Sequence, residues 1–243
     1  MRIVAISDTH GLHAEISLPP GDVLVHSGDI TQCGEPDAIQ DFVSWFGAQH
    51  FKHKIFIAGN HDFWAEQEPA KMQHLADEAS VHYLCGSGVT LEGVHFWGSP
   101  QTPRFMDWAF MLADNQAALN HWRQVPDTTD VLITHGPPHG VLDELDLTNN
   151  FVDSAAEQRR VGCTELINRV QQITPSLHIF GHIHEGFGTQ QVGKTRFLNA
   201  SQLDNRYRLA NLPLSVELSE SSQSADNVSS GVKEVHAVSE LEV

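Results

Sequence analysis

Short runs of apolar residues recur along the chain, and each run ends in glycine or in polar side chains. These runs predict strands over residues 2–6, 23–25, 54–58, 131–134 and 178–180. Continuous apolar runs of this length, bounded by glycine or polar residues, are typical of strands that are buried on both faces. We therefore expect a sheet that is covered on both sides by other parts of the chain.

Other segments show the period of amphipathic helices. After Pro36, which is tolerated in a first helical turn, apolar residues recur at the spacing of one helix face; they are Ile39, Phe42, Val43 and Phe46. Asp114 is predicted to cap a second helix, and residues 163–173 form a third. A polar, helix-prone stretch covers residues 63–79.

Further strands are predicted beyond these five. Residues 81–84, 89–91 and 94–97 predict an antiparallel meander. Residues 195–198 and 214–218 are interpreted as closing strands of a second sheet. The polar stretch from 143 to 160 gives no firm pattern.

The overall length suits one domain with a large core, because 243 residues can bury a substantial apolar interior. From residue 219 onward the chain is rich in serine and acidic residues and poor in large apolar ones. Such a composition is typical of disorder. We expect a folded domain over residues 1–218 and a mostly disordered, acidic and Ser-rich tail over 219–243.

The charge is strongly negative, with 14 Lys+Arg against 31 Asp+Glu and a formal net charge of -17. The sequence shows no stripe of basic residues, which argues against a permanent nucleic-acid partner and against binding to an anionic membrane. A small phosphoester substrate stays compatible, because a bound cation can reverse the local field. Oligomeric state is not predicted.

Cysteine usage and the first residues indicate the compartment. Cys33, Cys85 and Cys163 lack the spacing of disulfides or of metal clusters, which favours a reducing environment. Met1 leads directly into the first strand without the features of a signal peptide, and no apolar stretch reaches the ~20 residues that span a bilayer. We expect a cytoplasmic protein.

Side chains that bind metals or transfer protons follow the ends of the five strands predicted first. They are Asp8, His10, Asp29, Asn60, His61, His135, His182 and His184. Chemistry in such sheets collects just beyond strand ends. Any one of these residues alone could be a buried polar group that satisfies a neighbour. Their common placement after strand ends favours a single active site.

Oxygen and imidazole donors without thiolate suit Mn, Fe, Zn or Co. The donors considered as ligands are Asp8, His10, Asp29, Asn60, His135, His182 and His184. This set is too large for one ion with an open position, so we expect two divalent metal ions that share a bridging carboxylate. Two ions at ~3.5–4 Å can activate a bridging water and hold both oxygens of an in-line displacement. His61 is then free to hold phosphate or to protonate the leaving oxygen.

Five motifs, in this order, together resemble the calcineurin-like metallophosphoesterases. They are Asp8-x-His10, Gly28-Asp29-x4-Gly34, Gly59-Asn60-His61-Asp62, His135-Gly136 and Gly181-His182-x-His184. Each motif alone is weak, and the ordered set is specific. The residues around them, including 180–188 and Asn199-Ala200-Ser201, are similar to the subfamily of brain-expressed metallophosphoesterase-domain-containing phosphodiesterases.

The resemblance implies an α/β fold, a four-layer αββα sandwich of two mixed sheets flanked by helices. It also implies the ligands of each ion. The first ion would be bound by Asp8, His10, Asp29 and His184, and the second by Asp29, Asn60, His135 and His182. Asp29 would bridge the ions. Asn60 and His61 would bind substrate, with His61 as the catalytic histidine and Asp62 orienting it.

The expected activity is hydrolysis of small organic or cyclic-nucleotide phosphodiesters by a metal-bridging hydroxide. A phosphomonoesterase or nuclease with the same site is an alternative. A catalytically silent metal-binding scaffold is another, but it would be expected to lack a ligand or His61. His13 and His139 are weaker candidates to contact substrate. Phe105, Trp108 and Phe110 indicate a core or cleft wall more than a base-stacking surface.

Overall fold

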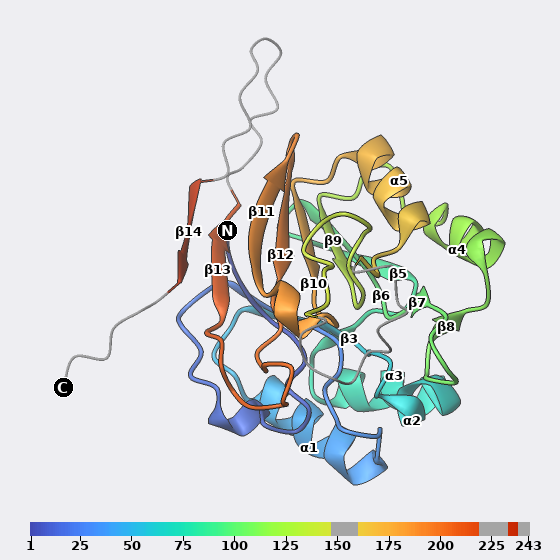
Figure 1. Ribbon diagram of the computed structural model, residues 1–243. Helices are drawn as coiled ribbons and strands as arrows, with labels where there is room; N and C mark the ends of the chain where they lie inside the picture. The colour runs from blue at the N-terminus through green and yellow to red at the C-terminus, as the bar shows by residue number, and fades with distance from the viewer. Residues whose placement is uncertain (147–159, 219–232, 238–243) are drawn as a thin grey trace.

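The computed structural model of the chain describes residues 1–146 and 160–218, and the backbone of Lys233–Ala237 (Figure 1). Most of the stretch from 143 to 160 therefore lies outside the described residues. The predicted tail does so too, except for Lys233–Ala237, which form a strand of the first sheet, and the disorder of its other residues stays a prediction. Two six-stranded sheets form the body of the protein.

The first sheet has the order β14-β13-β1-β2-β3-β4. Its parallel centre consists of β1 (Arg2–Ile6), β2 (Val23–Ser27), β3 (His53–Ile57) and β4 (His82–Tyr83). At the other edge, β13 (Leu214–Glu217) runs antiparallel to β1, and β14 (Lys233–Ala237) antiparallel to β13.

The second sheet has the order β11-β12-β10-β9-β6-β5. Its parallel strands are β12 (Thr195–Asn199), β10 (Leu177–Phe180), β9 (Val131–Thr134) and β6 (Val94–Ser99). Antiparallel edge strands are β11 (Gly188–Val192) and β5 (Ser87–Leu91). A separate pair joins β7 (Thr102–Pro103) to β8 (Met111–Leu112).

Alternate residues of each central strand contribute to different cores. In β1, Ile3 and Ala5 face the core between the two sheets, whereas Val4 and Ile6 face the core beneath the helices. The same alternation holds in β9, where Ile133 lies between the sheets. Because successive side chains point to opposite faces of a strand, a strand covered on both faces must be apolar throughout. The predicted double burial is confirmed.

Helices cover the outer face of each sheet, on separate sides of the molecule in Figure 1. The first sheet carries α1 (Pro36–Gly47), α2 (Phe63–Gln67) and α3 (Pro69–Glu78). The second carries α4 (Asn115–Trp122) and α5 (Thr164–Ile173). Asp114 caps α4 by accepting the N–H of Ala117 at 2.8 Å, as predicted. The four-layer αββα fold is confirmed.

Two predictions about strand pairing are wrong. The expected meander does not form, because β4 pairs in parallel with β3 while β5 and β6 form a hairpin in the other sheet. Likewise, β13 belongs to the first sheet and only β12 to the second. A local apolar pattern predicts a strand but carries no information about which distant strand it pairs with. Within the described ranges, no helix has the length and apolar character needed to cross a bilayer.

Candidate metal centre

The predicted site residues meet where the parallel strands of both sheets end. Asp8 is the second residue after β1, Asp29 the second after β2, and His182 the second after β10. His135 directly follows β9, and Asn60 follows β3 closely. Because the two sheets pack face to face, the carboxyl ends of these strands lie at one edge, and the loops beyond them form one site.

The backbone of the site adopts a conformation that is uncommon for these residue types. The φ angles are 52° at Asp8, 42° at His10, 54° at Asp29 and 69° at His182. A non-glycine residue in this left-handed region costs about 1–3 kcal/mol and is concentrated at functional sites. Hydrogen bonds hold the strained loops together: the N–H of Asp8 donates to Gly28 O at 2.9 Å, and that of His10 to Asp29 O at 3.1 Å.

The motif glycines are required by the close approach of backbone to carboxylates. A Cβ atom at Gly181 would lie 1.9 Å from Asp8 Oδ2, and one at Gly59 would lie 2.2 Å from Asp29 Oδ1. Real Cβ atoms do not approach other heavy atoms so closely. These glycines therefore let the site loops pack directly against the two acidic side chains.

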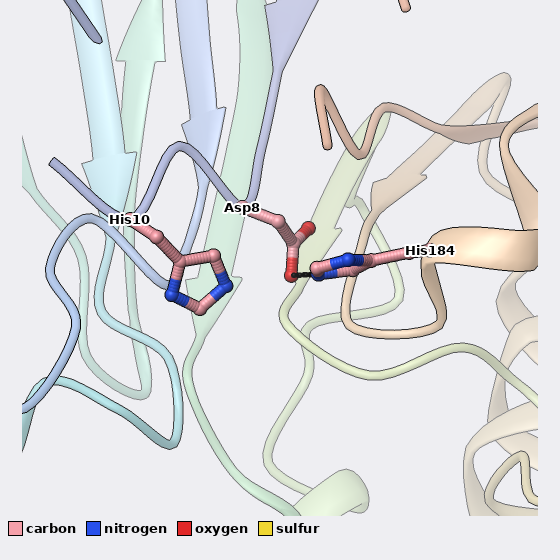
Figure 2. A group of neighbouring side chains, drawn as sticks. All are labelled: Asp8, His10 and His184. Carbon is pink, nitrogen blue, oxygen red and sulfur yellow. Dashed lines mark ion pairs between the residues drawn. The ribbon is translucent and has the colours of Figure 1, made fainter. Parts of the chain in front are cut away.

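Asp8, His10 and His184 form the first group of potential ligands, and their ligand atoms lie within 4.8 Å of one another. Figure 2 shows the Asp8 carboxylate between the two rings, with His184 Nε2 3.5 Å from Asp8 Oδ1. The Nδ1 atoms of the rings face backbone carbonyls, Asp204 O for His184 at 2.9 Å and Thr31 O for His10 at 3.1 Å. Since a carbonyl only accepts, each Nδ1 carries the hydrogen, and in the neutral ring Nε2 presents its lone pair to the site.

A second group consists of Asp29, His135 and His182. His135 Nε2 lies 3.3 Å from Asp29 Oδ2 and 2.8 Å from Asn60 Oδ1, so the Asn60 amide belongs to the same cluster. His135 Nδ1 lies 3.0 Å from Ser27 O, which orients this ring as the others are oriented.

Asp29 connects the two groups. Its Oδ2 lies 3.3 Å from His135 Nε2 and 3.7 Å from His10 Nε2. Its Oδ1 accepts the N–H of His61 at 2.9 Å, which fixes the carboxylate. Asp29 also joins His10 and His61 in a third group of potential ligands. One carboxylate therefore faces imidazoles from both halves of the site.

Burial and ion pairs shift the pKa values of the site residues. Burial opposes ionisation of Asp8 and Asp29, but interaction with His184 for Asp8 and with His135 for Asp29 outweighs it and holds both pKa values below their ordinary range. Burial also opposes protonation of His135 and His184, yet the same carboxylates raise the pKa of each to about 9. Burial lowers the pKa of His182 to about 4. The carboxylates are thus ionised and attract positive charge, which protons or metal cations can supply.

The residues fit divalent metal ions. The three groups contain only carboxylate and imidazole ligands, which suit Mn, Fe, Zn or Co. His10 Nε2 is buried and has no hydrogen-bond partner. A buried nitrogen without a partner is costly unless another group satisfies it, and a cation between Asp8, His10 and Asp29 would do so.

The prediction that Asp62 orients the His61 ring is wrong. His61 Nδ1 lies 2.6 Å from Gln32 O instead. The Asp62 carboxylate accepts hydrogen bonds from the N–H groups of Gly59, Ile30 and Thr31 and from the Thr31 hydroxyl. The Asp62 side chain therefore links the loop that carries Asp29 to the loop that carries Asn60.

Two further histidines and three aromatic residues were singled out in the sequence, and the structure shows where each lies. His13 is buried, 3.2 Å from Asp41 and against Phe42, and no described contact joins it to the site. His139 Nδ1 lies 3.7 Å from Asp143. Phe110 is buried in the core and Phe105 is exposed, whereas Trp108 is half-buried with its ring centroid 4.3 Å from that of His61.

Sequence reasoning missed two contacts of the site. Ser201 Oγ donates to Asp8 Oδ2 at 3.0 Å, although the sequence marks Ser201 only as part of the surrounding resemblance. The ring of Tyr207 lies 4.9 Å from that of His10 and 5.3 Å from that of His184. No sequence pattern marks Tyr207, because it lies in an irregular loop.

The chain is similar to several known proteins. The calcineurin-like phosphoesterase family model matches residues 1–186. The human Metallophosphoesterase domain-containing protein 1 is 38% identical, over 89% of this chain and 71% of its own length. A UPF0046 protein of Caenorhabditis elegans is 34% identical, over 88% of this chain and 79% of its own length.

A crystal structure of a protein from Thermus thermophilus has a similar fold. It superposes with a TM-score of 0.55 at 14% sequence identity, covering 86% of this chain and 96% of that chain. At this identity the likeness concerns the fold alone.

Proposed function

The chain belongs to the calcineurin-like phosphoesterase family, and from this premise we propose that it hydrolyses phosphodiesters, small organic and cyclic-nucleotide ones among them. Family membership implies metal-dependent hydrolysis of phosphoesters. The finer assignment, to diesters and to particular residues, is our inference from the site. Three free cysteines support the further proposal that it acts in the cytoplasm.

The main support for this proposal is the position of Asp29. Its Oδ2 is 3.3 Å from His135 Nε2 and 3.7 Å from His10 Nε2. We assign Asp29 as the bridge between two divalent ions, because a single carboxylate reaches both ligand groups. One ion would be held by Asp8, His10, His184 and Asp29, and the other by Asn60, His135, His182 and Asp29.

The ions, when bound, would lower the pKa of a coordinated water and neutralise charge on the phosphoester oxygens. The side chains of the protein have separate tasks. Ser201 and the His182 N–H hold the Asp8 carboxylate in place. The Asn60 amide and His61 face the substrate. His61 Nε2 lies 3.9 Å from Asp29 Oδ2, and when the ring is protonated at both nitrogens this is the nitrogen that can donate a proton to a leaving oxygen.

The described ion pairs of the site are compatible with a diester substrate. Among the residues that the structure describes, the ion pairs of Asp8 and Asp29 are all with histidines, and no Lys or Arg pairs with either carboxylate. A monoester carries up to two negative charges near neutral pH, and fixed Arg or Lys groups usually hold such a charge. A diester carries one, so fewer cationic side chains are needed.

The test compares a diester with a monoester at fixed metal. Protein stripped of metal and reloaded with Mn, Fe, Zn or Co is assayed for kcat/KM on bis(p-nitrophenyl) phosphate, p-nitrophenyl phosphate and a cyclic nucleotide. We expect the diesters to be preferred. A preference for the monoester would show a phosphomonoesterase. Two bound ions without hydrolysis of any substrate would show a silent metal-binding protein.

The bridging role is tested by Asp29→Asn. Removing a charge shared by two ions should lower the metal content well below two per chain and nearly abolish hydrolysis. Asp41→Asn is the matched control, because its carboxylate is exposed and lies outside the site. Retention of two ions and wild-type turnover by Asp29→Asn would refute the bridging assignment.

A further inference from the structure

A row of aromatic rings runs along the site and ends in a large aromatic residue on each side. His61 lies between Trp108 and His10, with ring centroids 4.3 and 4.7 Å away. His10 in turn lies 4.9 Å from Tyr207, which also contacts His184 at 5.3 Å. Trp108 comes from the loop between β7 and β8, and Tyr207 from the segment that follows β12.

Tyr207 is placed where folding alone would not favour a tyrosine. Its side chain is 45% exposed, and its φ angle is 58°, a conformation that glycine or asparagine adopts more readily. A residue that is both exposed and strained gains little from core packing. Strain of this kind points to a function for the side chain.

Hydrogen bonds fix the loop that carries Tyr207. The N–H of Tyr207 donates to Asp204 O at 2.9 Å, and the Asp204 carboxylate accepts from the N–H groups of Arg206 and Arg208 and from the Arg208 guanidinium. Asp204 O also accepts from His184 Nδ1. The loop is therefore anchored to a proposed ligand, and the Tyr207 ring is held at a set position beside the site.

Trp108 is anchored in a comparable way. Its ring packs against Phe63, with 5.9 Å between centroids and 29° between planes, and against His61. The next residue, Ala109, donates its N–H to Asn60 O at 3.2 Å. Before Trp108, the side chains of Phe105 and Met106 are 65% and 68% exposed. Trp108 thus provides a fixed apolar surface on the His61 side of the site.

We propose that Trp108 and Tyr207 recognise the organic part of the substrate by packing against a planar aromatic group, a nucleobase or an aryl ring. The inference rests on the proposed function, because it places the phosphate among the metal ligands and His61. From there the organic group would extend toward Trp108 and Tyr207, whose rings contact the histidines of the site. Aromatic side chains stack on any planar ring with little dependence on its hydrogen-bonding groups. Recognition by stacking also suits a chain of net charge -17.

Equilibrium binding to the metal-loaded protein tests the proposal independently of turnover. The ligands are methyl phosphate, phenyl phosphate and thymidine 5′-monophosphate, which share the phosphate and differ in the organic group. Stacking on an aromatic side chain typically strengthens binding by about 5- to 150-fold. We expect phenyl phosphate, thymidine 5′-monophosphate or both to bind at least roughly tenfold more tightly than methyl phosphate. Preference for thymidine 5′-monophosphate alone would identify a nucleobase, and preference for phenyl phosphate alone an aryl group.

Substitutions then show which residues are responsible for the tighter binding of the aromatic ligands. Trp108→Leu and Tyr207→Asn should each lower the ratio of affinities several-fold, whereas Tyr207→Phe, which keeps the ring, should retain it. Asn suits a positive φ, so the melting temperature of Tyr207→Asn should be no lower than that of the wild type. Val192→Ala, which removes an exposed apolar side chain on β11, is the control and should leave the ratio unchanged.

Equal affinity for all three ligands would overturn the proposal, as would Trp108→Leu and Tyr207→Asn variants that keep the wild-type ratio. Loss of the ratio in Tyr207→Phe would assign the effect to the hydroxyl and overturn the stacking role. A marked fall in the melting temperature of Tyr207→Asn would show a structural tyrosine. An aromatic preference in a protein that hydrolyses no phosphodiester would support recognition by these residues and refute only the proposed function.

Discussion

The Nδ1 atom of His61 lies 2.6 Å from the carbonyl oxygen of Gln32. A carbonyl oxygen only accepts hydrogen bonds, so Nδ1 carries the hydrogen and Nε2 faces the site. Nε2 lies 3.9 Å from Asp29 Oδ2, at the edge of the ligand cluster. The backbone of the loop that carries Asp29 therefore orients the proposed catalytic ring, and Nε2 can act as a proton donor when the ring is protonated at both nitrogens.

We predict that His61→Gln keeps both metal ions and loses proton donation. General-acid help is typically worth ~10²–10⁴-fold and matters most for a poor leaving group. The loss in kcat should therefore be larger on a cyclic nucleotide than on bis(p-nitrophenyl) phosphate, whose nitrophenolate departs without a proton. Metal analysis and kcat on both substrates measure this. Loss of one ion would show that His61 is a ligand, and an equal loss of rate on both substrates would favour phosphate binding.

Asp62→Ala should destabilise the fold. The Asp62 carboxylate accepts from the N–H groups of Gly59, Thr31 and Ile30 at 2.8, 3.0 and 3.2 Å, and all these groups are buried. Each buried donor left without a partner costs about 1–3 kcal/mol. We expect the free energy of unfolding of metal-free protein in urea to fall by at least ~3 kcal/mol. A near-normal value would mean that water replaces the carboxylate. Asp41→Ala, at an exposed position, is the control.

Gly181→Ala should disrupt the first ligand group. The added Cβ would lie 1.9 Å from Asp8 Oδ2, so the loop or the carboxylate must move. Overpacking of this kind typically costs ~1–3 kcal/mol, and displacement of Asp8 should reduce metal content as well. At Gly136 the nearest atom to an added Cβ is the Thr102 methyl group at 3.0 Å, so Gly136→Ala should be milder. Melting temperature and metal content compare the two variants, and equal behaviour would contradict the steric argument.

Acid should weaken the fold through His178. This ring is fully buried, with Nε2 2.9 Å from Thr134 Oγ1, and burial lowers its pKa to about 3. In the unfolded chain the pKa is about 6.5, so between these values the unfolded state binds the additional proton. Stability is therefore complete above about pH 6.5 and falls as the pH drops toward 3, by ~1.4 kcal/mol per pH unit from this group.

His178→Gln removes this titratable group. The slope of the free energy of unfolding against pH should therefore fall by the same amount. Urea unfolding of metal-free wild type and variant at pH 7, 6 and 5 measures the two slopes. Parallel curves would show that the buried ring does not contribute to the pH dependence.

The sequence determined the central buried strands, the helix faces and the polar residues that follow the ends of those strands. Buried strands must be apolar throughout, so β1, β2, β3, β9 and β10 are visible as local patterns. Polar residues at their ends have few structural reasons to be there, which is why Asp8, Asp29 and His135 could be named before the fold was known. Their order along the chain then indicated the family.

Tertiary structure decided what depends on long-range packing. Whether β4 and β13 join the first sheet or the second is set by pairing with distant strands, which a local pattern does not encode. Asp62 stands beside His61 in the sequence but turns to the backbone of Ile30 and Thr31, because buried N–H groups there need an acceptor. Trp108 and Tyr207 are far apart in the chain, and only the packing of the two sheets brings both to the site.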